Sequence, residues 1–196
     1  MTDTPPRQAP RWAPLTGGEA IWIFMTVELV TFGGFLLWHA ATWRTRPEVF
    51  AEARAHLDLR SGVLGTLLLL LGSWAAYQGV LSNALGRTRA AAGWLLAASL
   101  GGVAFTINKI IEWVPHWQEG LSLSTDAFWF TYFFLTQLHV MHVVPGIVIL
   151  AVLAWRSARG AYGPDNALSV EAGAAYWHLV DVIWILLFTV VYVMHP

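Results

Sequence analysis

The chain has 196 residues, of which 57% are hydrophobic and 12% are charged, and its mean hydropathy is +0.55. A soluble domain carries roughly twice that fraction of charge, so the composition excludes an ordinary soluble protein. The net charge of −1 gives no reason to expect nucleic acid as a partner, and the lack of cysteine excludes disulfides, iron–sulfur clusters and thiolate-bound metals supplied by this chain.

The apolar residues fall into five long blocks, each near or above the ~20 residues that a helix needs to cross the hydrocarbon core. We therefore predict an all-α bundle of five transmembrane helices over residues 18–43, 62–81, 90–114, 125–155 and 172–195. Residues 1–17 form a polar, proline-rich tail without the apolar run of a cleavable signal peptide. Residues 18–196 then make a single transmembrane domain.

Basic residues predict the orientation. The tail and the second and fourth loops share one side, which carries Arg7, Arg11, Arg87, Arg89, Arg156 and Arg159. The arginines of the other side all lie in the first loop, mixed with acidic residues. The positive-inside rule then places the N-terminus in the cytoplasm and the C-terminus outside.

Local patterns predict two further features. In the first loop, Thr45 and Glu48 have capping-box spacing, and an apolar stripe of Phe50, Ala53 and Leu57 follows, which predicts a short interfacial helix. Small residues let helix backbones approach closely, although glycine is also simply common in membrane helices. The candidate contact glycines are Gly33, Gly34, Gly62, Gly65, Gly101, Gly102 and Gly146.

Ionisable residues occur in four of the five predicted spans, and they fall into two layers. Counting ~1.5 Å per residue along each helix places five of them in one band, from the midplane toward the cytoplasmic side. This band contains Glu28, His139, His142, His178 and Asp181. The second layer, near the outer surface, contains Lys109 and Glu112, and the second span contains no ionisable residue.

Each group has a structural and a chemical interpretation. Lys109, the only lysine, and Glu112 most simply form an ion pair near a helix end, where both side chains can reach water. His139 and His142 could ligate a metal or haem, but hydrogen bonding between helices is favoured because no compact third ligand accompanies them. His178 and Asp181 share one helix face and are expected to tie the last helix to the fourth or the first. Glu28 has no partner on its own helix, so a proton-handling role and a structural hydrogen bond are equally supported.

Several segments resemble subunit III of the haem–copper oxidases. Residues 176–184, Tyr-Trp-His-Leu-Val-Asp-Val-Ile-Trp, closely resemble the last-helix motif of that family. Residues 136–143 are similar to the family's Thr-Gly-x-His-x-x-His-Val motif, with Gln137 in place of the usual glycine. Glu112 and Trp113 resemble the family's Glu-aromatic pair, and Glu28 falls where the family has a mid-membrane, carbodiimide-reactive glutamate. The resemblance spans all five helices, and the small size is similar to the nitric oxide reductase accessory (NorE-like) group.

The resemblance implies a non-catalytic subunit of a haem–copper oxidase or nitric oxide reductase in the bacterial inner membrane. It implies that this chain binds no haem or copper, which the catalytic partner subunit carries, and has no enzyme activity alone. It further implies that the chain holds phospholipid and supports proton uptake, stability or assembly. By resemblance, Glu28 would lie near a lipid or oxygen-access cleft, and His139, His142, His178 and Asp181 would form a network that ties helices together.

Two other functions compete with this one. A small membrane cytochrome would use His139, His142 or His178 as haem ligands. A proton-coupled transporter would be built around Glu28, although five spans cannot form two equal inverted halves.

Overall fold

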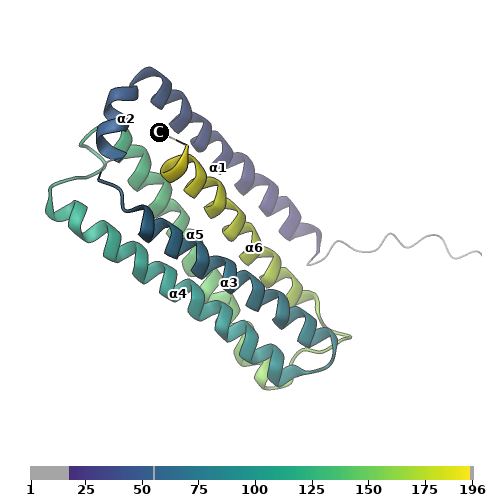
Figure 1. Cartoon of the computed structure of the whole chain (residues 1–196). Helices are drawn as coiled ribbons and strands as arrows, with labels where there is room; N and C mark the ends of the chain where they lie inside the picture. The colour runs from purple at the N-terminus through teal and green to yellow at the C-terminus, as the bar shows by residue number, and fades with distance from the viewer. Residues whose placement is uncertain (1–17, 55, 195–196) are drawn as a thin grey trace, which may run out of the picture.

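The computed structural model describes residues 18–54 and 56–194, and within them the chain is almost entirely helical. Its helices are α1 (Glu19–Thr45), α2 (Pro47–Arg54), α3 (Leu59–Ala84), α4 (Thr88–Gln118), α5 (Ala127–Ala158) and α6 (Leu168–Phe188), which a short π-helix, η1 (Thr189–Val193), continues. Five of these elements are long and apolar enough to cross a membrane, which confirms the predicted number of spans. The five long helices run side by side, and the C-terminus lies at the end that carries α2 (Figure 1). We call this end of the molecule the α2 end.

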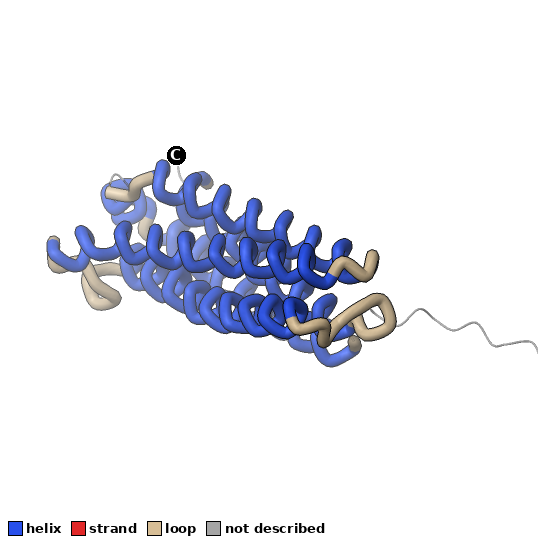
Figure 2. The backbone as a smooth tube through the Cα atoms, turned by 90° about the horizontal axis from the view of Figure 1, so that it is seen from below, coloured by secondary structure: helices blue, strands red, loops and turns tan. Residues whose placement is uncertain are grey.

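The core is a four-helix bundle in which α3, α4, α5 and α6 pack in a ring, each against two neighbours. Helix α1 packs mainly on the α5 and α6 side of that ring, and α2 packs on α5. Figure 2 shows the long helices lying lengthwise beside one another, with the connecting loops at both ends. Only 11% of the most apolar window of α1 is buried, compared with 56% in the last span, so α1 keeps most of its surface for lipid or another chain.

Trp177 fills the centre of the bundle, and three glycines make room for it. Its side chain is fully buried. A Cβ atom at Gly72, Gly102 or Gly146 would lie 3.3, 2.5 or 3.0 Å from the indole ring, so these three helices can approach Trp177 only without a side chain at those positions. The predicted contact role of Gly102 and Gly146 is therefore confirmed. At Gly33 and Gly34 the prediction is wrong, because nothing lies within 4 Å of an added Cβ there.

The first loop also differs from its prediction. Thr45 is the last residue of α1, where its hydroxyl donates to the Thr42 carbonyl at 2.9 Å, so it does not cap α2. Helix α2 starts at Pro47, a residue well suited to the first turn because it lacks the N–H that would be left unbonded there. Phe50 and Ala53 are buried against the bundle rather than turned toward a membrane surface, and the Phe50 ring lies 5.3 Å from that of Phe128.

Several helix ends extend beyond their predicted bounds, and the end of α4 and the start of α6 do so most. Helix α4 continues through Pro115 to Gln118, because a proline near the end of a helix removes one hydrogen bond and leaves the following turn intact. Helix α6 begins at Leu168, with Glu171 in its first turn, where a negative charge is favoured by the helix dipole. Residue 195 and the N-terminal tail 1–17 lie outside the described residues.

Candidate functional site

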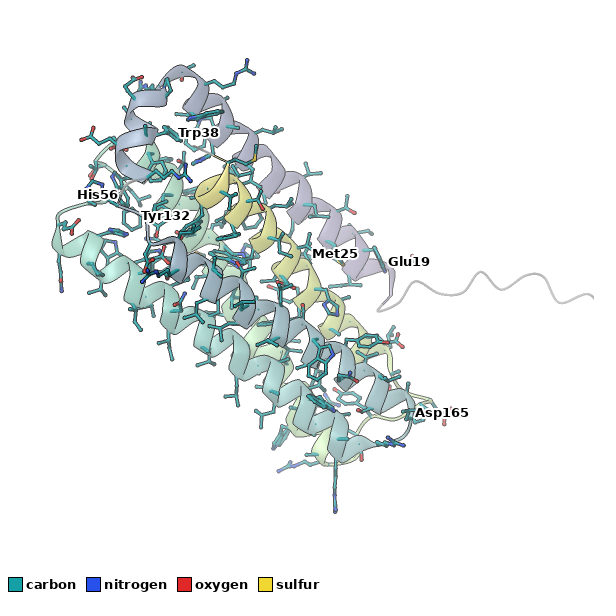
Figure 3. The ribbon with its side chains drawn as sticks, in the orientation of Figure 1. Glu19, Met25, Trp38, His56, Tyr132 and Asp165 are labelled. Carbon is teal, nitrogen blue, oxygen red and sulfur yellow. The ribbon has the colours of Figure 1, made fainter. Side chains whose placement is uncertain are left out.

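Five side chains from α3, α4, α5 and η1 form a buried ionic cluster near the α2 end, and they are Ser61, Lys109, Glu112, Tyr132 and Tyr192. Lys109 and Glu112 are one helical turn apart on α4, and Nζ lies 2.9 Å from Oε1. Their side chains are 0% and 2% exposed, so neither extends to water as the sequence suggested. Tyr132, one member of the cluster, is labelled among the side chains in Figure 3.

Hydrogen bonds from three other elements complete the shell of Glu112. Tyr132 and Tyr192 donate to Oε1 at 2.6 and 2.5 Å, and Ser61 donates to Oε2 at 2.5 Å. Lys109 also donates to the Tyr192 hydroxyl at 2.6 Å, and its ammonium lies 5.2 Å from the centre of the Trp184 indole. A charged pair in a low-dielectric interior is tolerated when its remaining lone pairs and protons are hydrogen-bonded, and this cluster meets that condition.

A second contact joins α1 to α5. His142 Nε2 lies 3.3 Å from Glu28 Oε2, with side chains 22% and 16% exposed. We call Glu28 and His142 the open pair. The sequence left Glu28 without a partner on its helix, and the structure supplies one from a helix more than one hundred residues later.

The second ring nitrogen of His142 contacts the backbone of its own helix. His142 Nδ1 lies 2.8 Å from the Leu138 carbonyl oxygen, which can only accept, so Nδ1 carries a hydrogen. In a neutral imidazole Nε2 then faces Glu28 as an acceptor, and in an imidazolium it faces Glu28 as a donor.

His178 joins α6 to α3. The predicted contact of His178 with the fourth or the first span is therefore wrong. Its Nδ1 lies 3.0 Å from the Ser73 hydroxyl. Asp181, one turn further along α6, is 5% exposed, and its Oδ1 has no hydrogen-bond partner among the described residues. No sequence pattern singles out Ser73, since serine is a mild polar residue that membrane helices accommodate readily.

His139 stands apart from the other histidines. It is fully buried and packs edge-on against Phe105 at 5.6 Å, with the Trp184 ring 5.2 Å away. Neither ring nitrogen has a hydrogen-bond partner among the described residues. His142, by contrast, meets Glu28 and Phe32 on α1, so the two histidines face different neighbours and do not converge on one ligand. Within the described ranges no three His, Asp or Glu side chains are grouped so as to hold a metal ion.

Four of the five groups predicted as one layer make three separate sets of contacts, and Oδ1 of the fifth, Asp181, has no hydrogen-bond partner among the described residues. Glu28 and His142 join α1 to α5, His178 reaches α3, and His139 sits in an aromatic pocket. The residues that sequence reasoning missed are Ser61, Tyr132, Tyr192 and Ser73. A buried tyrosine usually needs a partner for its hydroxyl, and that was the one available signal for Tyr132 and Tyr192.

Comparison with known proteins decides the family. The family model for cytochrome c oxidase subunit III matches residues 59–195, which is more than half of the chain. The chain belongs to the cytochrome c oxidase subunit III family. It is 33% identical over 175 residues to a quinol oxidase subunit 3 of Bacillus spizizenii, covering 88% of this chain and 84% of that protein. It is 28% identical over 173 residues to the cytochrome c oxidase subunit 3 of Thermostichus vulcanus, again covering 88% and 84% of the two chains.

A further relative is a probable cytochrome c oxidase subunit 3 of Mycobacterium tuberculosis, which is 26% identical over 175 residues, or 89% of this chain and 85% of that protein. Membership of the subunit III family makes the chain a non-catalytic subunit of a haem–copper oxidase, as the resemblance implied. It is a multi-pass membrane protein that associates with a catalytic oxidase subunit.

Proposed function

We propose that this subunit III stabilises its catalytic partner and holds phospholipid and a mobile proton on the α1 side of the bundle. The haem and copper would lie in that partner, in the bacterial inner membrane, with the N-terminus of this chain in the cytoplasm. The observation that carries the proposal is the contrast between a closed four-helix bundle and the largely uncovered α1, which presents the open pair at its contact with α5.

An open groove of about 590 Å³ between α1 and α5 supports the lipid part of the proposal. Its lining is almost wholly apolar and includes Val30, Gly34, Phe35, Trp38 and Phe134. Gly34 packs on no other helix and so deepens the groove. A hollow of this kind, lined by aliphatic and aromatic groups, suits an acyl chain, and Trp38 is the amphipathic ring expected near a membrane interface.

The open pair supports the proton part. It lies between α1 and α5 with both side chains partly exposed, and one proton can move between two atoms 3.3 Å apart without any change of backbone. A partly exposed ionisable pair inside a membrane span is costly unless it meets water, lipid headgroups or another chain. The catalytic subunit or a water-filled cleft beside α1 would supply that environment.

Gentle-detergent purification of the tagged chain from its native membrane tests the proposal. We expect haem-bearing oxidase subunits to co-purify, with phospholipid retained after extensive washing, and the chain released from them to be colourless. The identity of the co-purifying subunits distinguishes a quinol oxidase, a cytochrome c oxidase and a nitric oxide reductase. A chain that purifies alone, or that shows a Soret band of its own, would contradict the proposal.

A further inference from the structure

Four oxidisable aromatic rings form a chain from the bundle interior to a surface cavity at the α2 end. The ring centroids of Trp184 and Tyr192 are 6.3 Å apart, those of Tyr192 and Tyr132 are 6.3 Å apart, and those of Tyr132 and Trp129 are 5.5 Å apart. All four side chains are at most 3% exposed. Trp129 lines a cavity of about 290 Å³ between α2 and the start of α5, so one end of the chain of rings reaches the surface.

Two members of this chain of rings are joined to a base. A phenol that loses an electron becomes a strong acid, so its oxidation near neutral pH requires a nearby proton acceptor. Tyr132 and Tyr192 both donate to Glu112 Oε1, at 2.6 and 2.5 Å. Tyr176 differs, because its hydroxyl donates to the backbone carbonyl of His142 at 2.9 Å, and an amide carbonyl is a far weaker base than a carboxylate.

Lys109 makes the two tyrosines unequal. Its ammonium donates to the Tyr192 oxygen at 2.6 Å and lies 5.2 Å from the centre of the Trp184 indole. A positive charge at either place opposes the removal of an electron from that ring. Its contact with Tyr132 is more remote, 5.7 Å from the ring centre. Tyr132 therefore combines a carboxylate proton acceptor with a weaker cationic influence than Tyr192 or Trp184 experiences.

We propose that this chain of rings is a redox relay in which Tyr132 carries a radical and Glu112 accepts its proton. In the step, the Tyr132 phenol loses one electron to the oxidant and passes its hydroxyl proton to the Glu112 carboxylate, giving a neutral tyrosyl radical and a carboxylic acid. A soluble one-electron reductant that reaches Trp129 returns the electron, and the proton moves back to the phenol. In the cell the oxidant would be a high-potential radical of the oxygen-reducing partner, and this part alone rests on the proposed function.

The experiment uses the full-length chain in lipid nanodiscs with an external oxidant. A flash-generated ruthenium(III) tris-bipyridine complex in the aqueous phase oxidises the protein, and freeze-trapped samples are examined by electron paramagnetic resonance. We expect a tyrosyl radical in the native chain, the same signal in the matched variant Tyr176→Phe, and loss of the signal in Tyr132→Phe. Glu112→Gln retains a hydrogen-bonding side chain but removes the base, and we expect loss of the tyrosyl signal. In the native chain we expect formation of the radical to show a solvent deuterium isotope effect.

Trp129→Phe keeps the proposal testable if the cluster variants fold poorly, because it changes the surface end of the relay and leaves the ionic cluster intact. We expect slower formation of the radical in this variant. A tyrosyl signal that persists in Tyr132→Phe, radicals confined to tryptophan in the native chain, or unchanged kinetics in Trp129→Phe would each overturn the relay. Because no oxidase subunit takes part, these results are independent of the co-purification that tests the proposed function.

Discussion

The ionic cluster and the open pair are both acid–base contacts between membrane helices, and they differ in how completely the protein encloses them. The side chains of Lys109 and Glu112 are 0% and 2% exposed, whereas those of His142 and Glu28 are 22% and 16% exposed. Glu112 accepts four hydrogen bonds from four side chains on α3, α4, α5 and η1. Glu28 instead meets the His142 ring, whose Nε2 lies 3.3 Å from its Oε2.

The difference indicates which carboxylate stabilises the fold and which is accessible to its surroundings. A buried charge whose partners are all in place holds those partners in position, because removing any one of them leaves an unpaired group in a low-dielectric interior. A partly exposed pair gains little from its partner, because solvent and salt screen the attraction between the two groups. The cluster therefore holds the α2 end of the bundle together, and the open pair leaves α1 responsive to its surroundings.

The largest effect is expected from removing the carboxylate of the cluster. Glu112→Ala leaves the Lys109 ammonium buried without a counter-charge, and we expect a loss of about 3–5 kcal/mol in the free energy of unfolding. Unfolding in mixed micelles with increasing sodium dodecyl sulfate, followed by circular dichroism, measures it. The double variant Lys109→Met with Glu112→Gln removes both charges and should recover much of the loss. A Glu112→Ala variant as stable as the native chain would contradict the stabilising role of the ionic cluster.

A smaller loss is expected when one hydroxyl is removed and the ion pair is kept. Tyr192→Phe preserves the ring contacts but deletes a donor to Glu112 and an acceptor for Lys109. Hydrogen bonds to charged groups are worth about 1.5–3 kcal/mol, and we expect a destabilisation in that range in the same titration. Tyr77→Phe, at an exposed position on α3, is the control and should have no effect.

The contact between α3 and α6 should lie below the cluster in strength. Ser73→Ala removes the partner of His178 and places a methyl group in a site that a hydroxyl occupied. Interhelical hydrogen bonds of membrane proteins average about 0.6 kcal/mol, which is the loss we expect. Ser124→Ala, in the exposed loop before α5, serves as the comparison. A loss as large as that of Glu112→Ala would place the main tie of the bundle at His178 instead.

The smallest effect on stability is expected at the open pair. Glu28→Gln keeps a side chain that can donate to His142 Nε2, and exposed ion pairs contribute about 0–1 kcal/mol. We expect an unfolding curve close to that of the native chain. The variant also replaces the carboxyl group of residue 28, which can bind and release a proton, with an amide that cannot. A destabilisation well above this range would show that Glu28 is structural, like Glu112.

The sequence was sufficient for the number of spans, the ion pair on α4 and the family motifs, because each depends on residues close together in the chain. Composition and block length define a membrane helix, and the spacing of Lys109 and Glu112 places them on one face. Glu28 with His142, and His178 with Ser73, could not be paired in the same way. Which helices become neighbours depends on the packing of small residues around Trp177, and helical period alone does not determine that packing.

The ionic cluster illustrates the same limit. Its phenols come from α5 and from the π-helix, where Tyr192 donates to Glu112. A helical wheel drawn over residues 172–195 gives the face on which Tyr192 lies, but not the residue of another helix that it meets. The expectation that Lys109 and Glu112 extend to water failed for the related reason that Ser61, Tyr132 and Tyr192 enclose them.

The most direct test of the contrast between the two carboxylates is labelling by a membrane-permeant carbodiimide, followed residue by residue with mass spectrometry. The reagent requires a protonated carboxyl group that it can reach. We predict that Glu28 is modified rapidly, that His142→Phe changes its rate, and that Glu112 remains unmodified until the bundle unfolds. Modification of Glu112 at the rate of Glu28 in the folded protein would contradict the distinction between a closed cluster and an open pair.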